Sequence, residues 1–136
     1  MHSLIISCSE GRLAASLSAF QEELGEQDAD RLIVPGGPLQ LTRPGMERRV
    51  ALECIRALID GQGVRRVYLV SHQDCASYEQ VLGGRAFDQK ELLMRDLLRV
   101  KALLEHSFAT VDVRCYLIPW VEKGEDAGFG PAELVE

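Results

Sequence analysis

The order in which short apolar runs alternate with longer amphipathic stretches constrains the fold more than any other feature of this sequence. The short runs predict strands, at residues 4–8, 31–34, 66–71 and 111–118. The longer stretches repeat apolar residues with helical spacing and predict helices, at residues 12–24, 46–59 and 88–106, the last with Asp88 as its N-cap. Strands separated by helices are typical of βαβ units, which build a mostly parallel sheet.

We therefore predict an α/β fold in three layers, with a mostly parallel four-stranded sheet of strand order 2-1-3-4 and helices on both faces. In such a sheet the connections of the first and third strands diverge, and ligands bind in the crevice at the carboxyl ends of these strands. Residues 1–136 are expected to form one domain, whose glycine-rich and acidic segment 122–136 is loosely held.

Composition excludes several classes of protein. A hydrophobic content of 46% and a charged content of 26% are ordinary for a globular domain and exclude disorder. The net charge of −6 argues against nucleic acid and against a membrane surface as partners. No apolar stretch has the pattern of a signal peptide or a membrane span, so a cytoplasmic location is expected. In that compartment the four cysteines stay reduced, which favours metal binding or catalysis over disulfides.

Cysteine and histidine side chains lie where two of the predicted strands end. The first strand ends in Cys8, and the third is followed by His72-Gln73-Asp74-Cys75. Because these strands are neighbours in the predicted sheet, we expect Cys8, His72 and Cys75 to converge. Two thiolates and one imidazole suit a tetrahedral zinc ion with one open position. A single cysteine is more often a small buried apolar residue, but the joint placement of the three favours a metal site.

Glu10 and Arg12 flank Gly11 at the turn that leaves the first strand. A bidentate pair with Arg12 would keep Glu10 ionised and oriented toward a water on the zinc. Without that pairing, Glu10 could become a fourth zinc ligand. A third interpretation is that both residues only begin a helix, where an acidic side chain suits the helix dipole.

The other residues of these types receive structural interpretations. Cys54 lies on the apolar side of a predicted helix and Cys115 lies inside a strand, so both are expected in the core. His2 and His106 are expected at the surface, and Trp120 is expected to pack after the last strand.

The two motifs resemble those of a known family. Cys8-Ser9-Glu10-Gly11-Arg12 resembles the Cys-x-Asp-x-Arg motif of the β-class carbonic anhydrases, and His72-Gln73-Asp74-Cys75 resembles their His-x-x-Cys motif. The helix and strand within residues 51–78 are also similar to the family's approach to the second motif. The chain departs from the family pattern at Glu10, where the family has aspartate, and at Pro35-Gly36-Gly37-Pro38.

The resemblance implies that Cys8, His72 and Cys75 are the ligands of one Zn²⁺ per chain. It implies that Glu10 and Arg12 are catalytic, in the places of the family's aspartate–arginine dyad. It also implies carbon dioxide and bicarbonate as the small-molecule substrate, and a homodimer as the assembly.

Four hypotheses for function follow. The first is a zinc-dependent lyase that hydrates carbon dioxide reversibly to bicarbonate through a zinc-bound hydroxide, which Glu10 orients while Arg12 holds it. The second keeps this site but takes carbonyl sulfide or carbon disulfide as the substrate. The third is a non-catalytic zinc-binding relative in which Glu10 closes the site. The fourth makes Cys8 a metal-free nucleophile paired with His72, which leaves Cys75 without a role.

Overall fold

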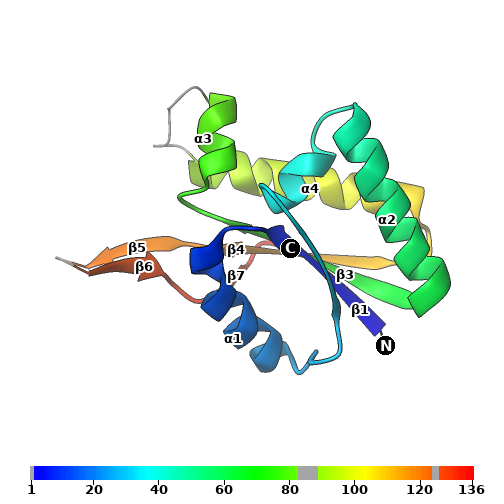
Figure 1. Ribbon diagram of the computed structural model, residues 1–136, viewed down its shortest axis with the longest axis horizontal. Helices are drawn as coiled ribbons and strands as arrows, with labels where there is room; N and C mark the ends of the chain where they lie inside the picture. The colour runs from blue at the N-terminus through cyan, green and yellow to red at the C-terminus, as the bar shows by residue number, and fades with distance from the viewer. Residues whose placement is uncertain (1, 83–88, 124–125) are drawn as a thin grey trace.

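A computed structural model describes residues 2–82, 89–123 and 126–136 and has a five-stranded sheet at its centre (Figure 1). The strand order is β2-β1-β3-β4-β7. The bounds are β1 (His2–Cys8), β2 (Asp30–Val34), β3 (Val64–His72), β4 (Asp112–Ile118) and β7 (Glu133–Leu134). The first four strands in this order run parallel, and β7 pairs antiparallel with β4. The predicted order 2-1-3-4 is therefore confirmed, with one short strand added at its edge.

Helices cover both faces of this sheet, which confirms the predicted three layers (Figure 1). The helix α1 (Ala14–Leu24), preceded by the 3-10 turn η1 (Gly11–Leu13), packs on one face. The helices α2 (Met46–Gln62) and α4 (Gln89–Ser107) pack on the other.

Alternation along β1 explains this arrangement, because successive side chains of a strand point to opposite faces. Ile5 packs with the apolar side chains of α1, whereas Leu4 and Ile6 pack with those of α2 and α4. All three are at most 1% exposed, so β1 is buried on both faces. A strand that is buried on both faces has apolar residues at successive positions, which explains the run Leu4-Ile5-Ile6 in the sequence.

The structure also contains elements that the sequence analysis did not assign. These are the 3-10 turn η2 (Gly37–Leu41), the helix α3 (Ala76–Leu82), and the strands β5 (Trp120–Lys123), β6 (Asp126–Phe129) and β7. All are shorter than the windows of roughly 11–18 residues in which periodicity is informative. The strands β5 and β6 pair antiparallel as a separate ribbon. The expected N-cap Asp88 lies outside the described residues.

None of the helices in the described part of the chain combines the length and the apolar character that a membrane span requires.

The register of the sheet places the ends of β1 and β3 side by side. Ile6 of β1 pairs with Leu69 of β3, so the last residues of the two strands, Cys8 and His72, lie at the same end of the sheet. This end of the sheet is formed by the carboxyl ends of the parallel strands, where open α/β sheets bind ligands.

Candidate metal centre

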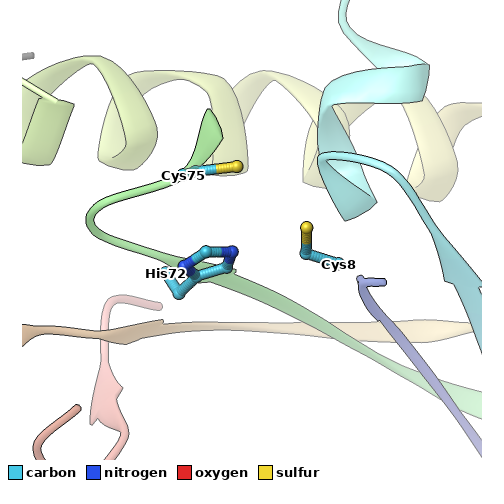
Figure 2. Close-up of side chains that lie close together, drawn as sticks. All are labelled: Cys8, His72 and Cys75. Carbon is cyan, nitrogen blue, oxygen red and sulfur yellow. The ribbon is translucent and has the colours of Figure 1, made fainter. Parts of the chain in front are cut away.

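Three side chains that could bind a metal meet at this end of the sheet (Figure 2). Cys8 ends β1, His72 ends β3, and Cys75 directly precedes α3. Each residue offers one ligand atom, which is the sulfur of a cysteine or a ring nitrogen of the histidine. These three atoms lie within 4.8 Å of one another. The donor atoms around a tetrahedral zinc ion lie roughly 3.5–3.8 Å apart, so small side-chain movements bring this group to that geometry.

The hydrogen bonds of His72 leave one ring nitrogen free for a metal. Nδ1 lies 2.7 Å from the backbone oxygen of Gln73, and because a carbonyl only accepts, Nδ1 must donate. Nε2 is then unprotonated, and it is buried with no hydrogen-bond partner among the described residues. An unpartnered buried nitrogen is costly in a protein interior unless a ligand binds it. The backbone carbonyl that orients the ring is a typical second partner of a metal-binding histidine.

The two thiols are also prepared to bind a cation. A hydrogen bond from Cys75, with further ones from the backbone N–H groups of Glu10 and Gly36, lowers the pKa of Cys8 to about 4. The Cys8 sulfur and burial raise the pKa of Cys75, because a second negative charge beside the first is unfavourable. A divalent cation removes that repulsion and favours the thiolate form of both. The donor set therefore fits zinc.

The departure from the family pattern after β2 has a structural reason at this site. Gly36 donates its backbone N–H to the sulfur of Cys8 at 3.2 Å. Gly37, at φ 56°, comes so close to β1 that an added Cβ would lie 2.8 Å from the backbone nitrogen of Cys8. Consecutive glycines with positive φ therefore let this loop touch the backbone at Cys8.

The structure brings Glu10 and Arg12 together as a bidentate pair. The distances are 2.7 Å from Arg12 Nε to Glu10 Oε1 and 2.9 Å from an Arg12 terminal nitrogen to Glu10 Oε2. This contact lowers the pKa of Glu10, which therefore stays ionised at neutral pH. Asp74 is a further partner of Arg12, at 3.2 Å from its carboxylate, and this partner was not predicted from the sequence. Asp74 has a φ of 57°, a conformation that aspartate tolerates better than most residues.

Aromatic side chains of the β5–β6 ribbon complete the surroundings of this pair. The guanidinium of Arg12 lies 5.0 Å from the ring centre of Trp120 and 5.6 Å from that of Phe129. Phe129 also meets the ring of His72 edge to face at 5.2 Å. Trp120 was expected to pack, but its partner Arg12 was not identified, because the ribbon reaches the site only through the tertiary fold.

The remaining cysteines and histidines lie outside the metal-binding group. Cys115 is fully buried, and burial raises its pKa to about 11, whereas Cys54 is half-buried. His106 is exposed, and the half-buried His2 forms a hydrogen bond of 2.8 Å with Asp30.

Comparisons with known proteins agree with the fold. No family model and no curated protein matches the sequence. Among solved structures, the β-carbonic anhydrase CafD of Aspergillus fumigatus is similar with a TM-score of 0.59 and 13% identity, over 95% of this chain and 88% of that one. A carbonic anhydrase from Glaciozyma antarctica is similar with a TM-score of 0.56 and 17% identity, over 98% of this chain and 81% of that one. The chain thus has the fold of the β-carbonic anhydrases.

Proposed function

We propose that this protein is a zinc-dependent carbonic anhydrase, which hydrates carbon dioxide reversibly to bicarbonate. The observation that carries the proposal is the buried Cys8–His72–Cys75 group beside a carboxylate that Arg12 holds. The shared fold of the two carbonic anhydrases supports the same conclusion.

In this proposal Cys8, His72 and Cys75 hold one Zn²⁺ per chain. Bound zinc lowers the pKa of a water toward about 7 and thereby supplies a nucleophile at neutral pH. Glu10 accepts a hydrogen bond from that nucleophile, since each of its oxygens keeps a free lone pair beside Arg12. Arg12 keeps Glu10 ionised and fixes the direction of its oxygens. The exposed Arg12 side chain also places this pair next to solvent, which must receive the released proton.

The contact between Glu10 and Arg12 favours this function over a closed, non-catalytic zinc site. To close the site as a fourth ligand, Glu10 would have to turn its carboxylate toward the metal and give up this two-point contact with Arg12. The use of Cys8 as a metal-free nucleophile paired with His72 would leave the converging Cys75 without a role. Hydrolysis of carbonyl sulfide or carbon disulfide would use the same residues, so it is a second candidate that only a substrate comparison separates.

A homodimer is part of the proposal. The strand β2 is an edge of the sheet and exposes Ile33, and Met46 and Val50 of the adjacent α2 are also exposed. A second copy that pairs with this edge would cover these side chains and satisfy the free backbone groups of β2. Light scattering during size-exclusion chromatography tests this, and a single monomeric species at micromolar concentration would contradict it. The cytoplasmic location also stays a prediction, which fractionation of the source cells tests.

Metal content and carbon dioxide hydration together test the proposed function. We expect elemental analysis to find about one zinc per chain. Stopped-flow assays are expected to show hydration by the zinc-loaded protein, and carbonyl sulfide in the same assay series tests the second candidate. The variant Glu10→Gln should keep its zinc but lose about 100-fold in kcat/KM. Glu22→Gln, an exposed glutamate on α1, is the matched control and should behave as the parent. A zinc-loaded parent without hydration activity would contradict the proposal.

A further inference from the structure

We propose that Gln89 is a positioning residue for the metal ligand Cys75. Gln89 is the first residue of α4, and its side chain is 2% exposed. Its Oε1 accepts the backbone N–H of Cys75 at 3.1 Å, and its Nε2 donates to the backbone oxygen of Cys75 at 3.4 Å. One buried amide thus binds both polar backbone groups of one residue, 14 positions away in the chain.

Cys75 needs such support because it is the only one of the three ligands outside the sheet. Cys8 and His72 end strands, and their backbones are aligned by pairing with Val34 and Ile118. Cys75 belongs to no helix or strand. The two hydrogen bonds of Gln89 take the place of a sheet ladder at this position.

The hydrogen bonds around α3 show what Gln89 supplies. The backbone oxygen of Cys75 already accepts the N–H of Glu79 at 3.0 Å, which begins α3. The N–H of Cys75 precedes the helix, so no helical carbonyl can accept it. Cys75 is 1% exposed, and without Gln89 this N–H would be a buried donor without a partner. Gln89 therefore fixes the Cys75 peptide and, with it, the direction in which the sulfur leaves the backbone.

A second polar contact shows that α4 acts as a scaffold for α3. The hydroxyl of Tyr78 donates to the carboxylate of Asp96 at 3.1 Å, and both side chains are buried. The segment that starts at Cys75 and continues into α3 thus contacts α4 at Cys75 and again at Tyr78. The long helix α4 packs directly on β4, so the position of Cys75 is coupled to the core of the domain.

The proposal rests on the metal site of the proposed function, but not on carbon dioxide as the substrate. Gln89→Met keeps the length of the side chain and removes both hydrogen bonds. Gln21→Met is the matched control, because Gln21 is also buried and donates to the backbone oxygens of Glu26 and Gln27 on α1's side of the molecule. If Gln89 only contributed to packing, both substitutions would lower the stability of the metal-free protein, and the two variants would bind zinc with the same affinity.

The experiment measures zinc affinity by competition with a chromophoric chelator, and unfolding of the metal-free proteins by denaturant. Gln89→Met is expected to weaken zinc binding about 10-fold relative to both the parent and Gln21→Met. In the cobalt-loaded protein, the sulfur-to-cobalt charge-transfer band should also weaken, because the Cys75 sulfur is less well aligned. Zinc binding by Gln89→Met as tight as in Gln21→Met would overturn the proposal.

A measurement on the parent protein covers the case in which Gln89→Met does not fold. Hydrogen exchange followed by NMR should show a protected Cys75 amide in both the metal-free and the zinc-loaded protein. An unprotected Cys75 amide in the metal-free protein would overturn the proposal, as would a parent protein that binds no zinc. A zinc-binding parent without hydration activity would contradict only the proposed function.

Discussion

Two groups of side chains share the candidate site, and they differ in exposure to solvent. Cys8, His72 and Cys75 are at most 6% exposed. Beside them, the side chains of Glu10, Arg12 and Asp74 are 19%, 49% and 39% exposed. The atoms that could bind a metal thus lie inside the domain, whereas the charged groups are partly exposed to solvent.

This difference shows that the two groups serve different purposes. The buried Nε2 of His72 has no hydrogen-bond partner among the described residues, which is unfavourable unless a ligand binds it, so a bound metal best explains the first group. Exposed ion pairs contribute little to stability. The contact between Glu10 and Arg12 is therefore best explained by the orientation that it imposes on the carboxylate.

Removal of a metal ligand should have the largest effect and tests the buried group. In His72→Ala and in Cys75→Ser, metal content is expected to fall below about 0.1 zinc per chain, because two donors do not retain zinc against competing buffers. Elemental analysis of dialysed protein measures this. Cys54→Ser, at a half-buried cysteine outside the group, should keep about one zinc per chain. Equal zinc content in all of these variants would disprove the ligand assignment.

The exposed group is tested by Arg12→Met. We expect kcat/KM for carbon dioxide hydration to fall about 100-fold, since Glu10 loses its orientation. Zinc content and the midpoint of denaturant unfolding should stay close to those of the parent. Arg49→Met is the control, because Arg49 forms an exposed pair with Glu53 on α2 and contacts none of the residues of the candidate site in the described ion pairs. Unfolding at clearly lower denaturant in Arg12→Met than in Arg49→Met would mean that the pair is structural.

A glycine-to-alanine substitution beside each group compares the buried group with the exposed group directly. Gly37→Ala forces a side chain against the backbone of Cys8 at positive φ and is expected to cost about 1–3 kcal/mol of stability. Gly11 lies beside Glu10 and Arg12, and an added Cβ there meets no atom within 4 Å. Gly11→Ala should therefore be nearly neutral. Denaturant unfolding of the two variants measures the difference, and equal stabilities would refute the close approach at Gly37.

The aromatic contact of Arg12 should have the smallest effect. Trp120→Leu removes one ring face from the guanidinium and is expected to lower kcat/KM about 2- to 5-fold, while zinc affinity is kept. Phe108→Leu is the control, because it removes a ring that lies 4.7 Å from Arg56 outside the site. A loss of activity in Phe108→Leu as large as that in Trp120→Leu would show that the effect reflects general destabilisation.

Periodicity and turn residues were sufficient to predict the strand order and the convergence of Cys8, His72 and Cys75. Both follow from local patterns, since a buried parallel strand is a continuous apolar run and its end is marked by polar residues. The helix α3 was missed because it has only seven residues. Its neighbour Gln89 received no role, because one glutamine at a helix start has no pattern that distinguishes it.

The sequence by itself determined the α/β class of this protein, the order of its parallel strands and the identity of three converging side chains that could bind a metal. Only the tertiary structure decided the side-chain partners that are distant in the chain: Asp74 and the β5–β6 ribbon contact Arg12, and Gln89 binds the backbone of Cys75. The physical reason is the range of the interactions. Strand and helix patterns repeat over a few residues, whereas the contact between Arg12 and Asp74 joins residues 62 positions apart, which only the folded sheet brings together.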